Sequence, residues 1–124
     1  MPRAQIPAMV RKVAEIAQRN RLPIPLFGHI GDGNLHPNIL CDLRDPEEME
    51  RVQRAAREIF EAAVALGGTL SGEHGIGTLK REFLSESLDA TGIELMQRIK
   101  WALDPENLLN PGKIFPVPPM DSGI

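Results

Sequence analysis

The feature that most constrains the fold is a glycine-rich turn at residues 31–34, which separates two segments with the pattern of strands. Residues 25–30 and 35–42 carry apolar side chains and are bounded by turn-forming residues, so both are predicted to be extended. A short loop joins two such strands into an antiparallel hairpin. Pro37 cannot donate to a ladder, which predicts an unpaired side on the second strand.

Amphipathic helices are predicted on both sides of this hairpin. Apolar side chains recur at helical spacing from about residue 4 to residue 19. Asp45 and Pro46 are typical of the N-cap and the first position of a helix. That second helix is predicted to continue to Leu66 and to end at the glycine pair 67–68.

Shorter elements are predicted in the remainder of the chain. A short strand is expected at residues 69–71, a brief helix at 79–84 and a longer helix from about 92 to 103. The longer helix is predicted to turn one apolar face inward, formed by Ile93, Met96, Ile99 and Leu103. This order of elements predicts an α+β fold, with a small antiparallel sheet covered by helices.

Length and composition bound the class of protein. A chain of 124 residues with 42% hydrophobic and 25% charged residues fits one globular domain, predicted over residues 1–116, with 117–124 as a flexible tail. A net charge of −3 gives no basic footprint for nucleic acid. The single cysteine, Cys41, excludes an internal disulfide. No apolar run approaches the ~18 residues of a membrane span, and the N-terminus lacks a signal-peptide core, so a cytoplasmic location is expected.

The three histidines of the chain all lie in two glycine-rich segments, which is the most informative pattern for function. If Ile30 pairs with Leu35 across the turn, His29 falls directly opposite His36, and Asn38 lies on the same face. Side chains directly opposite on an antiparallel pair have Cβ atoms about 5 Å apart. This register therefore predicts two imidazoles within reach of one ion.

Two histidines and one carboxylate with open positions suit a divalent metal such as zinc, manganese or iron. Glu73 is the best candidate for the third ligand, and Asp32 is the alternative, although its place in the turn favours a capping role. His74 follows Glu73 and is predicted to accept a proton beside the ion. The opposing interpretation is a pair of surface histidines bonded to backbone or water.

Three motifs in one order carry a family resemblance. They are Gly-His-Ile-Gly-Asp-Gly-Asn-Leu-His at 28–36, Ser-Gly-Glu-His-Gly-Ile-Gly at 71–77, and Asp-Pro at 104–105 followed by Asn-Pro-Gly-Lys at 110–113. With these motifs the chain resembles the C-terminal part of FAD-linked 2-hydroxy-acid oxidases and dehydrogenases of the vanillyl-alcohol-oxidase superfamily. That group includes the flavin subunit of glycolate oxidase, D-lactate dehydrogenase and D-2-hydroxyglutarate dehydrogenase. The resemblance implies that this chain folds as the ferredoxin-like half of the C-terminal domain of such an oxidase.

The resemblance implies a role for each residue of the histidine motifs. His29, His36 and Glu73 would coordinate a divalent ion, His74 would take the hydroxyl proton of the substrate, and Asn38 would lie beside the substrate. The reaction implied is the oxidation of a 2-hydroxy acid to a 2-oxo acid, with the Cα hydrogen leaving as hydride to the flavin.

The resemblance also implies that Asn110 and Lys113 approach FAD. The competing interpretations are local turn capping for Asn110 and a solvated side chain for Lys113. Members of this family are several times longer, and an FAD-binding domain precedes the region that matches.

We therefore expect a fragment or one piece of a split enzyme that needs an FAD-binding domain or subunit as partner. Alone it should neither hold FAD tightly nor turn over substrate. Missing upstream strands would leave an unpaired sheet edge, so a homodimer or larger assembly is expected. The alternatives are a non-catalytic α+β module for metal binding or interaction, and a free-standing metal hydrolase, for which the sequence supplies no nucleophile.

Overall fold

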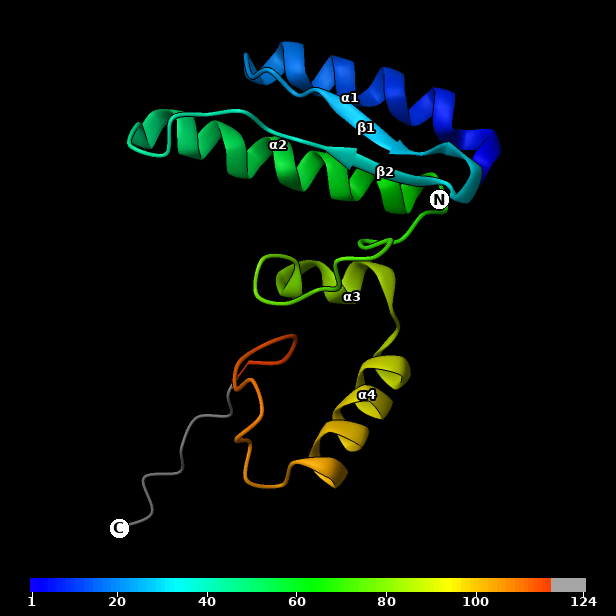
Figure 1. Ribbon diagram of the computed structural model, residues 1–124, viewed down its shortest axis with the longest axis vertical. Helices are drawn as coiled ribbons and strands as arrows, with labels where there is room; N and C mark the ends of the chain where they lie inside the picture. The colour runs from blue at the N-terminus through cyan, green and yellow to red at the C-terminus, as the bar shows by residue number, and fades with distance from the viewer. Residues whose placement is uncertain (117–124) are drawn as a thin grey trace. The chain divides into compact units, whose positions relative to one another are not determined.

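The computed structural model describes residues 1–116. The chain divides into two compact units, Met1–His74 and Gly75–Ile124 (Figure 1). Helices and a two-stranded antiparallel sheet make the fold α+β, as predicted. The expected domain at 1–116 stays a prediction, and the expected tail at 117–124 lies outside the described residues. None of the described helices is both long enough and apolar enough to cross a bilayer.

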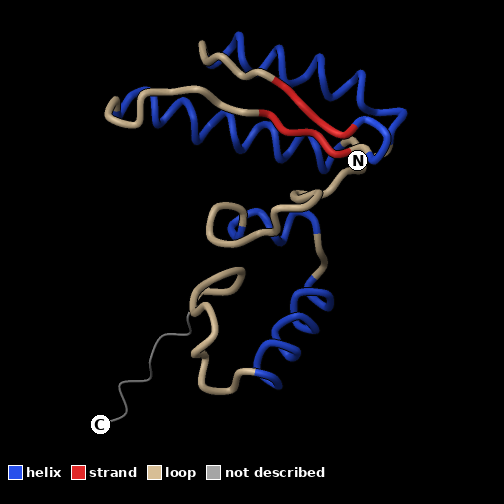
Figure 2. Tube along the Cα trace, in the orientation of Figure 1, coloured by secondary structure: helices blue, strands red, loops and turns tan. Residues whose placement is uncertain are grey.

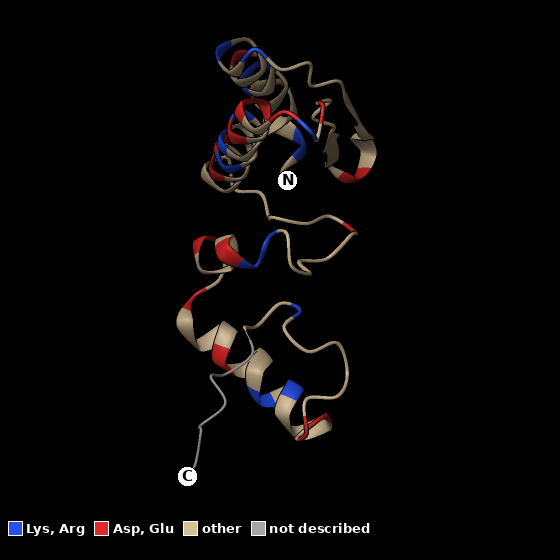
Figure 3. Ribbon diagram, turned by 90° about the vertical axis from the view of Figure 1, so that its left-hand side faces the viewer, with Lys and Arg blue, Asp and Glu red and all other residues tan. Residues whose placement is uncertain are grey.

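The first unit has two layers, one of helices and one formed by the hairpin (Figures 1 and 2). Its main elements are α1 (Ile6–Asn20), β1 (Leu26–His29), β2 (Asn34–Pro37) and α2 (Pro46–Ala65), with short 3-10 turns at Arg3–Gln5 and Ile30–Asp32. Helices α1 and α2 pack against each other and are covered on one side by the hairpin. Acidic and basic residues are interspersed along both helices (Figure 3).

The core of this unit is formed by the apolar faces of the two helices. Its buried members are Met9, Val13, Ile16, Leu22, Ala55 and Ile59, and Leu35 of β2 packs against them. One buried polar side chain joins the helices: Asn20 is 1% exposed, donates to the Ile16 carbonyl at 3.0 Å and accepts from Arg54 Nε at 2.8 Å. Because both of its hydrogen-bonding groups are satisfied, this buried amide fixes the end of α1 against α2.

The start of α2 confirms the capping prediction. Asp45 is the N-cap, and its carboxylate accepts hydrogen bonds from the backbone amides of Glu47 and Glu48 at 2.9 and 3.2 Å. Pro46 occupies the first helical position. The helix ends one residue before Leu66, and Gly67 follows with a φ of 74°, which is the left-handed conformation that glycine adopts without a steric penalty.

The hairpin register differs from the predicted one by two residues. His29 pairs with Asn34 and Phe27 with His36, so the prediction that His29 lies directly opposite His36 is wrong. The cause is the loop, in which residues 30–32 form a 3-10 turn and Gly33, at a φ of 71°, closes it. Since side chains alternate with a period of two, a shift by two residues leaves both histidines on the same face.

Both strands are shorter than predicted, β1 because Ile30 belongs to the 3-10 turn and β2 because Pro37 lacks a ladder donor. β2 ends at Pro37 rather than near residue 42. Two backbone bonds extend the alignment past the strands, from the Asn38 amide to the Pro25 carbonyl at 2.9 Å and from the Leu40 amide to the Pro23 carbonyl at 3.0 Å. The strand predicted at 69–71 is absent from the described residues.

The second unit is built from a 3-10 turn (Arg81–Phe83), α3 (Leu84–Ser87) and α4 (Ala90–Leu103). The helix predicted at 79–84 therefore begins later, and the helix predicted from residue 92 begins two residues earlier. Asp89 caps α4 by accepting from the Gly92 amide at 2.7 Å.

The inward face predicted for this last helix is confirmed only in part, because Ile93 and Met96 are half-buried while the other two residues are exposed. Ile99 and Leu103 are 54% and 79% exposed, and no residue of α4 is buried. Helical spacing shows which side chains share a face, but only a neighbouring element can cover that face.

Candidate metal centre

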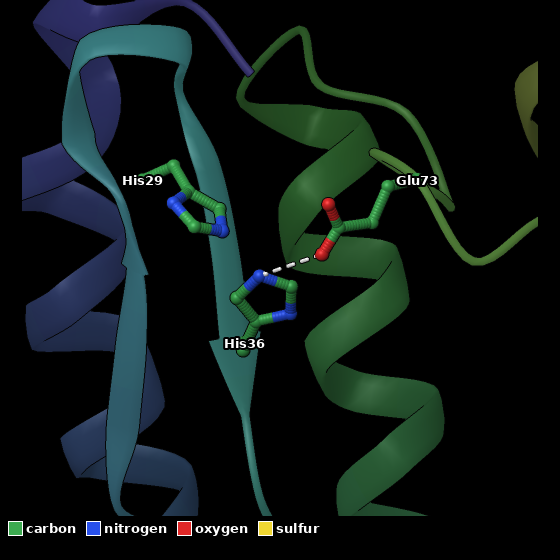
Figure 4. Close-up of side chains that lie close together, drawn as sticks. All are labelled: His29, His36 and Glu73. Carbon is green, nitrogen blue, oxygen red and sulfur yellow. Dashed lines mark ion pairs between the residues drawn. The ribbon is translucent and has the colours of Figure 1, made fainter.

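Two imidazoles and one carboxylate converge on the outer side of the hairpin (Figure 4). One ligand atom from each of His29, His36 and Glu73 lies within 4.8 Å of the other two. His36 Nε2 is 3.1 Å from Glu73 Oε1, and the two imidazole rings stand edge to face with centroids 5.5 Å apart. The three side chains thus meet from two strands and a loop far along the chain.

Local structure explains how the histidines reach this point. His29 ends β1, and His36 lies in β2 two positions beyond Asn34, the residue that pairs with His29. They are diagonal neighbours on one face, a spacing that long side chains bridge readily. The opposite face carries Leu35 into the core, so alternation directs the histidines outward.

Glu73 comes from the loop that follows α2. The Gly68 amide donates to the Ala63 carbonyl at 2.8 Å, which turns the chain away from the helix end. Leu70 is 4% exposed, and its burial anchors the loop to the protein interior. The chain then passes the hairpin and presents the Glu73 carboxylate to His36.

The donor set and its spacing fit a divalent ion. Bonds of about 2.1 Å to nitrogen and oxygen place the ligand atoms of a tetrahedral ion about 3.4 Å apart, so small side-chain rotations suffice here. The His36 and Glu73 side chains are 24% and 47% exposed, which leaves one side of the group open to solvent. Open positions are what a catalytic metal needs to bind water or substrate.

His74 lies beside the three-residue group. Its Nε2 is 3.4 Å from the same oxygen of Glu73 that faces His36, and the His36 and His74 rings have centroids 5.5 Å apart. The His74 side chain is 73% exposed, so it can exchange protons with solvent. The sequence predicted a proton acceptor beside the ion, and that role stays a prediction.

Two other residues considered from the sequence lie near the hairpin. Asp32 belongs to the 3-10 turn of the hairpin loop and is not a member of the three-residue group. Asn38 is exposed and follows β2 on the same alternation as His36. Its proposed contact with substrate stays a prediction.

Asn110 and Lys113 belong to the second unit, in a turn of their own. The Lys113 amide donates to the Asn110 carbonyl at 3.2 Å, and Asn110 has a φ of 52°. The turn is held by Arg81, whose Nη1 donates to the Gly112 carbonyl at 3.0 Å, and by the Ile114 amide, which donates to the Gly77 carbonyl at 2.8 Å. A left-handed asparagine supports a local turn role for Asn110. The roles of both residues toward FAD stay predictions.

Asn34, which the sequence assigned to the turn, lies against the site. It is the cross-strand partner of His29 and shares the face of both histidines. The wrong register concealed this position, because pairing Ile30 with Leu35 leaves Asn34 inside the loop. Alternation from His36 alone would have indicated it.

The model of the family described as FAD linked oxidases, C-terminal domain, matches residues 1–114. The chain belongs to this family.

Several curated members of the FAD-linked oxidases are clearly similar. The chain is 50% identical over 115 residues to glycolate oxidase subunit GlcD of Bacillus subtilis, covering 93% of this chain and 24% of that protein. It is 39% identical over 115 residues to the probable mitochondrial D-lactate dehydrogenase of Danio rerio, covering 93% and 23%. It is 38% identical over 115 residues to D-2-hydroxyglutarate dehydrogenase of Stutzerimonas stutzeri, covering 90% and 25%. The chain therefore spans about a quarter of the length of these relatives.

Proposed function

We propose that this chain is the substrate- and metal-binding portion of an FAD-dependent oxidoreductase that oxidises a 2-hydroxy acid, of the glycolate or D-lactate type, to a 2-oxo acid. The observation that carries the proposal is the convergence of His29, His36 and Glu73. Membership of the FAD-linked oxidases and the names of the similar proteins support the reaction class. The ion is zinc, manganese or iron, the metals that this donor set favours.

When bound, the ion supplies Lewis acidity toward the hydroxyl and carboxylate oxygens of the substrate, and FAD supplies the acceptor for the hydride. The two histidines and Glu73 would hold the ion. Asn38 contacts the substrate from the same face of the hairpin. These residues fix the position of the substrate, which is the part of catalysis that this chain contributes.

His74 acts as the proton acceptor. In our proposal its Nε2, the nitrogen nearest Glu73, takes the proton of the substrate hydroxyl as the Cα hydrogen leaves with its electron pair. The imidazolium formed at this exposed position returns the proton to solvent. Glu73 next to it stabilises that positive charge.

The partner in this proposal is an FAD-binding domain or subunit, since the chain spans about a quarter of its relatives. Asn110 and Lys113 approach the flavin from this chain's side. We expect the purified 124-residue protein to be colourless after gel filtration with excess FAD. Stoichiometric absorbance of flavin at about 450 nm in the protein peak would contradict this division of roles.

The proposal is tested in a chimera in which this chain replaces the matching 115 residues of the Bacillus subtilis protein. The chimera should reduce a dye with glycolate or D-lactate, lose this activity to a chelator and recover it with zinc, manganese or iron. His74→Gln should lower kcat by roughly 10²- to 10⁴-fold at unchanged metal content. Glu61→Gln, on the exposed side of α2, is the matched control.

Two results would oppose the proposal. If the activity of the chimera survives both chelation and His74→Gln, catalysis does not depend on this site. A chain that binds metal and folds into the chimera without restoring oxidation of either acid favours the non-catalytic metal-binding module.

A further inference from the structure

The side chain of Asn34 fills the space beside Gly72, the residue that precedes Glu73. A Cβ atom added to Gly72 would lie 2.2 Å from Asn34 Oδ1, 2.5 Å from its Cγ and 3.0 Å from its Nδ2. Real Cβ atoms do not approach other heavy atoms so closely. A side chain at residue 72 would therefore displace either the Asn34 amide or the loop that carries Glu73.

Backbone conformation does not explain this glycine. Gly33, Gly67, Gly75, Gly77 and Gly112 have positive φ values, whereas Gly72 does not. An alanine would thus be tolerated by the Gly72 backbone itself. The group that a side chain at this position would meet is the Asn34 amide.

Asn34 is held on its other side by the facing strand. It pairs with His29, and a Cβ atom added to Gly28 would lie 2.4 Å from the Asn34 carbonyl oxygen. The Asn34 backbone is thus seated against one glycine and its side chain against another. This places the amide between the strand that ends in His29 and the loop that carries Glu73.

We infer that the contact between the Asn34 side chain and Gly72 positions Glu73 relative to His29 and His36. Asn34 is a positioning residue here, because it acts through Glu73. This inference rests on the metal site of the proposed function. Metal–ligand distances are held within about 0.2 Å, so a methyl group that displaces the loop, or the Asn34 amide that positions the loop, would carry the carboxylate out of bonding range.

The test is a double-mutant cycle read out as zinc affinity by isothermal titration calorimetry on the full chain. Gly72→Ala should weaken zinc binding by roughly 10- to 100-fold, the range seen when groups that orient a ligand are altered. Asn34→Ala removes the three atoms that an added methyl would meet, and should weaken binding by roughly 10-fold. The double variant should bind zinc like Asn34→Ala and more tightly than Gly72→Ala.

Gly31→Ala is the matched control. It lies in the same hairpin loop, and a Cβ atom there would meet nothing within 4 Å. Its zinc affinity should equal that of the unmodified chain. Thermal unfolding of all five proteins separates loss of the site from loss of the fold.

Three results would overturn the inference. They are wild-type affinity in Gly72→Ala, a double variant no tighter than Gly72→Ala, and, if Gly72→Ala does not fold, wild-type affinity in Asn34→Ala. A chain that binds no zinc would instead reject the metal site. In that case the contact is tested by NMR. A cross-peak between the Asn34 side-chain amide and the Gly72 α-protons is expected without metal, and its absence would reject the contact.

Discussion

Replacing Glu73 by glutamine should separate the charge of the third ligand from its shape. The amide has nearly the same volume as the carboxylate and keeps an oxygen that can face a cation. It loses the negative charge that lies 3.1 Å from His36 Nε2. The two histidines remain in place because their strands do not depend on Glu73.

The size of the effect follows from Coulomb's law at the exposure of the site. Glu73 is 47% exposed, so the dielectric constant of water is the appropriate conservative choice. A divalent ion and a unit negative charge about 2.1 Å apart then attract each other by about 4 kcal/mol. An ion must also break the exposed His36–Glu73 pair, which offsets at most about 1 kcal/mol. The net loss of about 3 kcal/mol is roughly a hundredfold in affinity.

The assay is a competition titration of zinc against a chromophoric chelator, with Glu61→Gln as the control for loss of one acidic charge. We expect unchanged affinity in the control and roughly hundredfold weaker binding in Glu73→Gln. An affinity within about threefold of the unmodified chain, a difference below about 1 kcal/mol, would show that Glu73 does not bind the ion.

Three other predictions concern the fold. Asn20→Ala should lower the free energy of unfolding by about 2–4 kcal/mol in urea denaturation, because Arg54 loses its buried acceptor; a change under about 0.5 kcal/mol would count against this role. The Lys100 ammonium beside Asp104 lowers the pKa of that carboxyl, so its stabilisation should be present above pH ~4 and lost on further acidification. Trp101 fluorescence should report that loss, and Asp104→Asn should flatten it. Light scattering should give the mass of a dimer or larger assembly; a monomer at high concentration would contradict the expected edge pairing.

Much of the first unit follows from short stretches of sequence. Asp45 and Pro46 predicted the start of α2. The Asp45 carboxylate accepts from amides two and three residues away, and the fixed φ of Pro46 suits the first helical position. The pattern of β1 and β2 followed from the glycine-rich turn between them. The alternation of His29 and His36 survived a wrong register because the error was an even number of residues.

The errors arose where residues outside the element decide the outcome. The hairpin register depends on the 3-10 conformation of the loop, which the residues of the strands do not encode. Residues 69–71 lack a strand because no neighbouring strand offers them a ladder among the described residues. Ile99 and Leu103 share a helical face as predicted, yet they are exposed because no described element covers them.

By itself the sequence determined the local elements, their caps and the presence of two imidazoles on one face of a hairpin. These properties depend on interactions within a few residues, which any copy of the same stretch would make. The tertiary structure alone decided that Glu73 meets His36 and that Asn34 fills the space beside Gly72. Such contacts join segments far apart in the chain, and only the packing of the hairpin and of α2 into one unit sets the distance between them.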